Sequence, residues 1–305
     1  MSIKYHIPDF LRHFHLNILL ADYMKKYPDR FYDDITIGSV YGTFPTSLWN
    51  GGRYFEGTVD KRIISEVLKQ FNQRGIPCRF TFTNPLLTEE HLSDPFCNYV
   101  MKTANNGLNE VIVASDLLED HIRKTYPRYK ITSSTCKQIE DYDKLCTELD
   151  KPYSLVVLDY NWNNNFEFLE KMPQKDKIEI LINACCMPNC PRRGEHYRAI
   201  GENHIKYAEF RKKFPNGQFR CPEFKCGQQT LHLYQTTDYS THVKPADIYE
   251  KYVPMGFENF KIEGRSTPDI NVLENYVYYM AKPEWKDTVR LELLLSLTKK
   301  YKYFM

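Results

Sequence analysis

The chain has 305 residues, a length at which an α/β barrel can form one domain with a sizeable core. Its 41 basic and 39 acidic residues nearly balance and no long block of one sign occurs, so the whole molecule carries no general electrostatic attraction to nucleic acid, although a local basic patch stays open. Apolar stretches such as residues 291–297 are far shorter than the roughly 20 residues that cross a bilayer, so we expect no membrane contact.

The first thirty residues and the cysteine content indicate the compartment. His, Asp, Asn and Pro interrupt the region where a secretory signal needs an unbroken apolar core. We therefore expect a cytoplasmic protein, in which the nine cysteines stay reduced. A cluster of cysteines in that compartment indicates metal binding or catalysis instead of a disulfide framework.

Short β-branched or apolar runs alternate with amphipathic stretches along the chain. We expect a helix at residues 16–26, a first strand at residues 35–40, and a helix at residues 59–71 that ends before Gly75. Further strands are predicted at residues 78–83, 110–114, 129–133, 154–158, 178–183, 241–243 and 259–263. A helix over residues 268–280 follows the last of them.

Eight βα units predict a closed, TIM-like (β/α)₈ barrel in place of an open sheet. We assign residues 1–305 to a single domain, with the barrel at about 33–282 and an extra C-terminal helix at about 284–303. A long insert at about 184–238 follows the sixth predicted strand. Roughly 55 residues separate that strand from the next, where a loop of 2–6 residues and one helix are usual.

The insert contains five of the nine cysteines. Two pairs, Cys186 with Cys190 and Cys221 with Cys226, bring four thiolates to one site if the helix between them folds back. Four thiolates bind either a zinc ion or a [4Fe–4S] cluster, and the spacing differs from the Cys-x₂-Cys of zinc ribbons, which favours iron–sulfur. Cys185 is an alternative to Cys186, because neighbours on an extended chain point in opposite directions.

The insert directly follows a predicted strand, so we expect it at the carboxyl-terminal rim of the barrel, where the active sites of such barrels lie. The other four cysteines are scattered along the chain. We expect them to be small buried residues, namely Cys78, Cys97, Cys136 and Cys146.

The last predicted strand alternates apolar and charged residues. Phe260 and Ile262 should face the helices, whereas Lys261 and Glu263 should face the lumen. A buried Lys beside a buried Glu is costly unless the two form an ion pair or bind a ligand, and both interpretations stay open. Arg265 continues the inward parity and suits a carboxylate or phosphate. Lys261, Glu263 and Arg265 are our candidate catalytic residues.

Candidate substrate-binding residues lie at the ends of other predicted strands. In the first loop, Trp49 and Arg53 flank two glycines and could stack on a planar substrate; the alternative is a glycine-rich turn with one packed tryptophan. Other polar residues at strand ends could bind substrate or act as helix caps and turn residues. We include Tyr41, Asn84 and Asp159 as candidates; the rest of this set comprises Ser115, Asn161, Asn183 and Lys244.

Two motifs carry a resemblance to a known family. Residues 260–265, Phe-Lys-Ile-Glu-Gly-Arg, resemble the end-of-barrel signature of the collagenase-like peptidase family of unassigned catalytic type, peptidase family U32. Residues 183–193, with the helix that begins at Glu195, resemble the region that holds its cluster cysteines. The resemblance implies a barrel with a [4Fe–4S] cluster, and oxygen-independent hydroxylation of an RNA base or the ubiquinone ring. It assigns the cluster to Cys186, Cys190, Cys221 and Cys226, and the substrate pocket to Lys261, Glu263 and Arg265.

Three hypotheses follow. The first is an iron–sulfur redox or hydroxylating enzyme that acts on a small aromatic or nucleobase-like substrate. The second is a peptidase-like hydrolase with a structural metal and acid–base chemistry by Glu263, although no Ser-His-Asp, HExxH or GxSxG arrangement is visible. The third is a non-catalytic, metal-stabilised binding subunit that pairs with a second family member.

Overall fold

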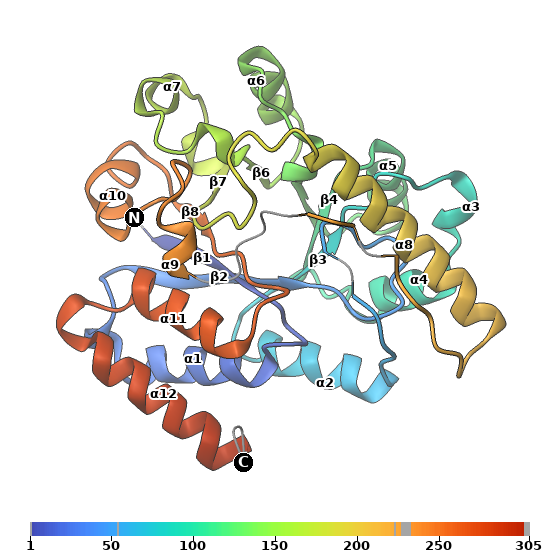
Figure 1. Ribbon diagram of the computed structural model, residues 1–305, viewed down its shortest axis with the longest axis horizontal. Helices are drawn as coiled ribbons and strands as arrows, with labels where there is room; N and C mark the ends of the chain where they lie inside the picture. Colours follow the sequence, from blue (N-terminus) through green and yellow to red (C-terminus); the bar gives the residue numbers. More distant parts are fainter. Residues whose placement is uncertain (1, 54, 223, 227–232, 302–305) are drawn as a thin grey trace.

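The structure is a computed structural model that describes residues 2–53, 55–222, 224–226 and 233–301. Eight parallel strands form a closed barrel in which each strand pairs with its neighbours in chain order and β8 pairs with β1 (Figure 1). The predicted fold class is confirmed. The strands are β1 (Ile3–Pro8), β2 (Ile35–Gly42), β3 (Cys78–Phe82), β4 (Glu110–Val113), β5 (Lys130–Ser133), β6 (Leu155–Val157), β7 (Ile178–Leu181) and β8 (Asn259–Lys261).

One of the eight strands differs from the prediction. The first strand is Ile3–Pro8, which the sequence hides because Lys4, His6 and Pro8 interrupt its apolar residues. The strand predicted at residues 241–243 is wrong: this segment is not part of a strand, although Val243 donates a hydrogen bond to the Ile182 carbonyl just after β7. The insert therefore follows the seventh strand of the barrel, the strand that we had predicted as the sixth.

Helices surround the barrel (Figure 1). The α-helices are α1 (Phe14–Lys26), α2 (Lys61–Asn72), α3 (Glu89–Leu92), α4 (Pro95–Thr103), α5 (Asp116–Thr125), α6 (Tyr142–Asp150), α7 (Phe166–Lys171), α8 (Arg193–Lys213), α9 (Leu233–Thr236), α10 (Pro245–Asp247), α11 (Asp269–Met280) and α12 (Lys286–Tyr301). Short 3₁₀ turns are η1 (Pro28–Arg30), η2 (Thr135–Lys137), η3 (Tyr160–Trp162), η4 (Lys175–Lys177) and η6 (Pro283–Trp285), and η5 (Ile248–Tyr252) is a π turn.

The core lies between the strands and these helices. Outward-facing residues such as Tyr5, Phe80 and Phe260 are fully buried against the helical layer. The apolar faces of the helices supply the other half of this layer, as in α2, where Ile64, Leu68 and Phe71 recur at helical spacing and are buried. Two faces of each strand are thus used differently: the outer face packs the core, and the inner face is free to carry polar residues.

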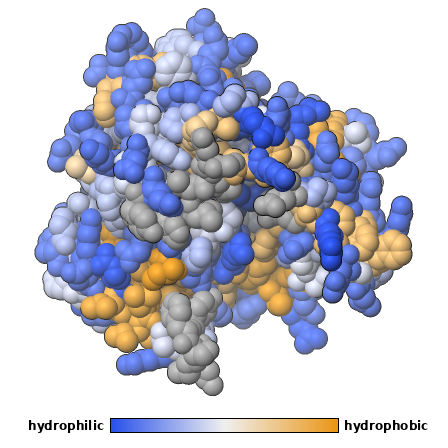
Figure 2. All heavy atoms as spheres, in the orientation of Figure 1, coloured by the Kyte–Doolittle hydropathy of each residue, from blue (hydrophilic) through white to orange (hydrophobic). Residues whose placement is uncertain are grey.

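The C-terminal helix packs on the barrel exterior, as predicted. Val289, Leu293 and Leu297 of α12 form one buried stripe, whereas Leu291 and Leu295 are more than half exposed. Figure 2 shows apolar side chains gathered around α11 and α12 on a face that is otherwise mostly hydrophilic. Residues 302–303 of the predicted helix lie outside the described residues. Within the part of the chain that the structure describes, every helix is too short or too polar to cross a bilayer.

Candidate functional site

A layer of buried charges lies inside the barrel. Glu179 on β7 lies 3.1 Å from the Lys261 Nζ on β8 and accepts from the Arg79 guanidinium on β3. His6 Nε2 on β1 lies 3.6 Å from the same carboxylate. Arg79 also donates to Glu110 on β4 at 2.8 Å. One carboxylate therefore joins side chains from three other strands.

The charge states of this layer follow from burial and from its neighbours. Burial raises the pKa of Glu179, but Lys261, Arg79 and His6 outweigh burial, so the pKa lies well below its usual value. Burial also lowers the pKa of His6 to about 3, with Arg79 adding to the shift. Burial lowers the pKa of Lys261, and Glu179 opposes that change. At neutral pH the layer contains a neutral His6 and an ionised Glu179.

A cavity at the carboxyl-terminal mouth lies next to this layer. It offers about 80 Å³ to the centres of water molecules, which is room for several waters or one small organic group. Strand ends, the first loop and the insert all contribute to its lining, which comprises Tyr41, Gly52, Arg53, Thr81, Thr83, Ile112, Ser134, Thr135, Cys136, Tyr160, Leu181, Cys186, Tyr197, Lys261, Glu263 and Arg265. All three candidate catalytic residues and one candidate metal ligand thus meet at one cavity.

Glu263 forms an ion pair with Arg53, in the loop after β2, and not with Lys261. Its Oε1 accepts from the Arg53 guanidinium, and its Oε2 accepts from the Cys185 backbone N–H at 2.9 Å. Asn183 fixes the backbone beneath it, because the Asn183 amide donates to the Glu263 carbonyl at 3.0 Å and accepts from its N–H. The internal pair that we considered between Lys261 and Glu263 is not formed, since Lys261 reaches Glu179 instead. Both Glu263 oxygens are therefore already engaged.

Among the described residues, Arg265 donates its hydrogen bonds to neutral oxygen atoms, and its guanidinium lies 6.0 Å from the centre of the Tyr41 ring. Its Nη1 donates to Thr81 Oγ1 at 2.8 Å and to Asn50 Oδ1 at 3.4 Å, and its Nη2 donates to the Gly51 carbonyl at 3.1 Å. Burial lowers the pKa of Arg265; the Asp9 carboxylate opposes this change, but it accepts from two backbone N–H groups and makes no ion pair with Arg265 among the described residues. The cavity therefore presents a cation whose charge no described carboxylate neutralises by direct contact.

The loop after β2 can approach Arg265 closely because residue 52 is a glycine. Gly52 has a φ of +75°, and a Cβ there would lie 3.0 Å from Arg265 Nη2. Tyr41 also lines the cavity. Lys261 Nζ lies 4.5 Å from its ring centre, and its hydroxyl donates to the Ile262 carbonyl. The expected positions of Tyr41 and Arg53 at the mouth thus agree with the cavity lining.

Three of the candidate substrate-binding residues do not belong to the described lining of the cavity. Trp49 is completely buried, and its indole N–H donates to the His91 carbonyl at 2.8 Å, so it is the packed tryptophan of the alternative interpretation. Asn84 is also buried and donates to the Leu48 carbonyl at 2.9 Å. Asp159 pairs with Arg193 at the start of α8, at 2.5 and 3.1 Å. These three side chains are buried, and their hydrogen bonds connect neighbouring segments of the protein.

The other polar strand ends act mainly as structural residues. Ser115 is the N-cap of α5 and accepts from Leu118, and Asn161 accepts from the Asn189 N–H in the insert at 2.9 Å. Lys244 is the N-cap residue of α10 and makes no side-chain capping bond. Two scattered cysteines, Cys78 and Cys97, are buried as expected. Cys146 and Cys136 are only partly buried, and the Cys136 thiol lines the cavity.

The two cysteines at the start of the insert point to different surroundings. Cys186 lines the cavity, whereas Cys185 is buried beside Glu263. Burial raises the pKa of both thiols, and the Arg53 guanidinium opposes that change in each case. Of the two alternatives, Cys186 is the one that faces the mouth of the barrel.

The second cysteine segment lies along α8 and leads back to the first. Arg192 donates to the Lys225 carbonyl at 3.1 Å, and the ring of Phe224 stacks on His196 at 4.5 Å. Charge on Cys190 and on Cys226 would each raise the pKa of Cys186, which places both thiols within electrostatic range of Cys186. The predicted helix between the pairs, α8, thus lets the two segments approach the same rim.

Cys221 lies at the other end of this second segment. The adjacent Pro222 carbonyl accepts from Asn203 of α8 at 3.1 Å, and eleven residues, about 16 Å of helix, separate Asn203 from Arg192. Among the described residues, no group of three or more His, Cys, Asp or Glu side chains has the geometry to hold a metal ion. Thiolates are donors that suit zinc or iron–sulfur, but their arrangement in the described part of the chain does not form a ligand shell. A complete shell would require Cys221 and its neighbours to move closer to Cys186.

The chain is similar to few known proteins. No family model matches it. It is 21% identical over 238 residues to the "Uncharacterized protease MJ1657" of Methanocaldococcus jannaschii, which covers 75% of this chain and 67% of that protein. Among solved structures, the U32 peptidase Mk0906 superposes with a TM-score of 0.51 at 12% identity over 88% of this chain and 95% of that chain. The expected resemblance to peptidase family U32 is confirmed in the fold.

Several residues of the site were not singled out from the sequence. Glu179 and Arg79 are lone charges in otherwise apolar strands, at the positions that face the lumen, and this parity is the signal that could have identified them. Cys136 was interpreted as a small core residue because it stands alone in the sequence. Tyr160 and Tyr197 carry no sequence signal, since their place at the cavity depends on how the insert folds.

Proposed function

We propose that the chain is a metal-dependent enzyme of the U32 peptidase-like barrel type, with a thiolate-held [4Fe–4S] cluster at the mouth of its barrel. Cys186, Cys190, Cys221 and Cys226 would hold the cluster, and zinc is the alternative metal. When bound, such a cluster would transfer one electron at a time. The observation that carries the proposal is the cavity that both the Cys186 thiol and the Arg265 guanidinium line.

The cavity supports a small, planar and anionic substrate. Arg265 offers a guanidinium without a direct ionic partner among the described residues, which suits a carboxylate or a phosphate. Tyr41, Tyr160 and Tyr197 supply aromatic surface around the same space. Redox chemistry on such a substrate is the reaction class that we propose, and oxygen-independent hydroxylation, to which several members of the family that the chain resembles are linked, is the specific reaction that the resemblance implies.

The residues around the cavity would position the substrate and limit the access of water. The Lys261 ammonium, held by Glu179 at 3.1 Å and over the Tyr41 ring, is the group that can donate a hydrogen bond at the floor of the cavity. Arg53 is held by Glu263, so both can orient groups without large movement. These side chains pre-organise the site because their partners come from separate strands and loops.

A peptidase-like hydrolase remains the second candidate, because the proteins that the chain resembles carry the names protease and peptidase. The contacts of Glu263 count against acid–base chemistry by this residue, since the Arg53 guanidinium and the Cys185 N–H already occupy its two oxygens. Cleavage of a peptide pool by the unmodified protein and its loss in Glu263→Gln would favour the hydrolase. No cleavage by the unmodified protein would remove it.

The direct test is anaerobic reconstitution with ferrous iron and sulfide. We expect a brown protein with broad absorbance near about 400 nm that dithionite bleaches, as for thiolate-ligated iron–sulfur clusters. Binding of an aromatic carboxylate such as benzoate should change this spectrum in the unmodified protein and not in Arg265→Gln. A colourless protein that binds stoichiometric zinc would show that the site holds a structural zinc ion and no cluster.

A further inference from the structure

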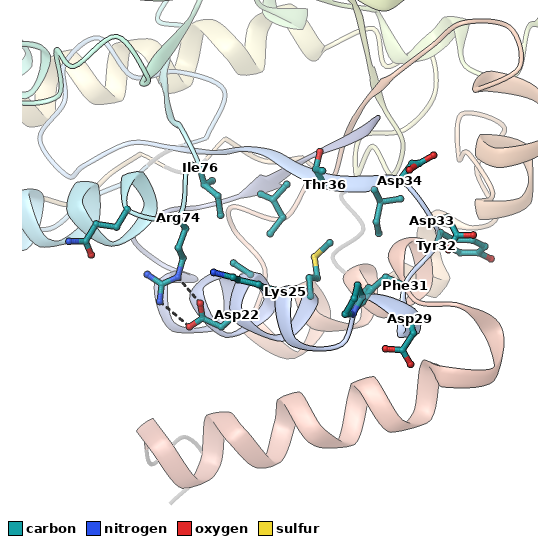
Figure 3. Close-up of a pocket in the computed structure, with 17 residues that line it drawn as sticks. Asp22, Lys25, Asp29, Phe31, Tyr32, Asp33, Asp34, Thr36, Arg74 and Ile76 are labelled. Carbon is teal, nitrogen blue, oxygen red and sulfur yellow. Dashed lines mark hydrogen bonds and ion pairs between the residues drawn. The ribbon is translucent and has the colours of Figure 1, made fainter. Parts of the chain in front are cut away.

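A second hollow lies beside the amino-terminal half of β2, on the side away from β1, and shares no lining residue with the cavity at the barrel mouth. It is a groove of about 1050 Å³ between α1, the amino-terminal half of β2 and the turn after α2 (Figure 3). Apolar side chains of Ala21, Met24, Ile35, Ile37 and Ile76 line much of it. Its dimensions suit a short extended segment of polypeptide.

The floor of the groove is a strand edge without a strand neighbour. Pairing of β3 with β2 begins at Val40, so residues 35–39 of β2 have no partner strand on this side among the described residues. The Ile3 N–H bonds to the Asp34 carbonyl, and because backbone groups alternate sides along a strand, those of Ile35 and Ile37 turn toward the groove. An exposed edge of this kind can accept another strand.

The charges around the groove favour a basic partner. Four aspartates and two cations line it, and Asp22 is neutralised by Arg74 through two hydrogen bonds of 2.8 and 2.9 Å (Figure 3). Asp29 and Asp34 are exposed and take part in no ion pair among the described residues. At the same end, Asp33 pairs with Lys282. The lining thus carries a net negative charge that is concentrated away from Arg74.

From this geometry we propose that the groove binds an extended, basic peptide segment of a partner protein, which adds a strand to the free edge of β2 at Ile35 and Ile37. Main-chain hydrogen bonds to these two residues supply the affinity. Apolar side chains of the peptide face the isoleucines and Met24, and basic side chains reach Asp29 and Asp34. This site is independent of the proposed chemistry at the barrel mouth.

The test uses a fluorescein-labelled, capped hexapeptide of alternating lysine and valine, with a glutamate–valine peptide as the matched control. We expect the full chain to bind the basic peptide with a Kd below about 1 mM and to bind the acidic peptide at least tenfold more weakly. Amide hydrogen exchange at Ile35 and Ile37 should slow when the basic peptide is bound. Equal binding of the two peptides, or unchanged exchange at these amides, would overturn the proposal.

Two variants separate the strand edge from simple charge attraction. Ile37→Pro removes an N–H that faces the groove and leaves the pairing of β2 with β1 in place, so peptide binding should fall at least fivefold. Asp34→Lys should also weaken binding, whereas Asp143→Lys on α6, which is also exposed, should not. Retained binding in both test variants would contradict the proposal. If the protein dimerised with increasing concentration and Ile37→Pro abolished the dimer, the occupant of the groove would be a second copy of the chain and not a peptide of a partner protein.

Discussion

Glu179 on β7 and Lys261 on β8 lie 3.1 Å apart inside the barrel, and this contact links the floor of the lumen to the cavity at its mouth. Glu179 is fully enclosed and also receives the Arg79 guanidinium. Lys261 reaches the cavity through its other side, over the Tyr41 ring. The charge of Glu179 therefore holds in place a cation on which the proposed site depends.

Removal of this carboxylate should be costly. In Glu179→Gln the buried Lys261 and Arg79 cations lose their shared counter-charge, and we expect a loss of about 3–5 kcal/mol in the free energy of unfolding. Urea denaturation followed by circular dichroism measures it. The matched control is Glu167→Gln, which breaks an exposed pair with Lys171 and should leave the free energy of unfolding almost unchanged. Similar losses in the two variants would show that the layer is not a tight ionic network.

Stability should fall in mild acid because His6 is buried in its neutral form. Burial lowers its pKa to about 3 in the folded protein, so between about pH 3 and 6.5 the unfolded chain binds a proton that the folded chain does not. The contribution is complete above pH 6.5 and is lost as the pH falls, by about 2 kcal/mol between pH 7 and pH 5. His204 and His242, with pKa values lowered by burial to about 4, act in the same direction.

Urea denaturation at pH 7 and pH 5 measures this dependence. His6→Gln should flatten the slope of stability against pH by about one proton over this interval, while a slope from the other histidines with lowered pKa values, His204 and His242 among them, should remain. Glu179, whose pKa is lowered, adds a further loss only below its usual pKa, so it does not contribute between pH 5 and pH 7. An unchanged slope in a folded His6→Gln protein would mean that His6 takes up a proton in the native state.

Arg265 should control the binding of anions. Benzoate should raise the Tm of the unmodified protein, since a ligand that binds only the folded state stabilises it by about 2.7 kcal/mol at 100 times its Kd. Arg265→Gln should abolish the shift and cost only the hydrogen bonds to Thr81, Asn50 and Gly51, because the arginine has no direct ionic partner among the described residues. The control is Arg290→Gln on α12, because Arg290 does not line the cavity and is paired with Glu274. An equal benzoate shift in Arg265→Gln would exclude this role.

The rim should depend on the pair between Asp159 and Arg193. Both side chains are almost completely buried, and the pair fixes the start of α8 to the end of β6. Asp159→Asn should therefore destabilise the protein by about 3–5 kcal/mol and speed amide exchange in the first turns of α8. Exchange in α12 should stay unchanged. If exchange in α8 were unaffected as well, the pair would not position the insert.

The sequence was sufficient to predict the repeated βα units and to predict which side chains of the last strand face the lumen. Alternation in residues 259–263 predicted that Lys261 and Glu263 face inward, and both line the cavity. Their partners were not predictable, because strands that are distant in the chain meet only when the barrel closes: Lys261 pairs with Glu179, and Glu263 pairs with Arg53. The first strand was missed for a related reason, since His6 interrupts an apolar pattern in order to face the lumen.

The cysteine pairs show the same limit. Their spacing predicted two segments joined by a helix, and α8 with its flanking contacts agrees with that arrangement. The distance between thiols depends on loop conformation, which periodicity does not encode. Trp49 illustrates the converse, because an aromatic residue beside two glycines fits a substrate loop and a packed turn equally well, and burial decides for the turn.

The iron and sulfide content of the reconstituted protein tests the central claim most directly. We expect four irons and four sulfides per chain in the unmodified protein, typical of one [4Fe–4S] cluster. Cys226→Ser and Cys186→Ser should lose most of the iron, while Cys97→Ser, a buried cysteine outside the insert, should retain it. Iron content that is independent of Cys186 and Cys226, or an absence of bound iron in the unmodified protein, would contradict a metal centre at the barrel mouth.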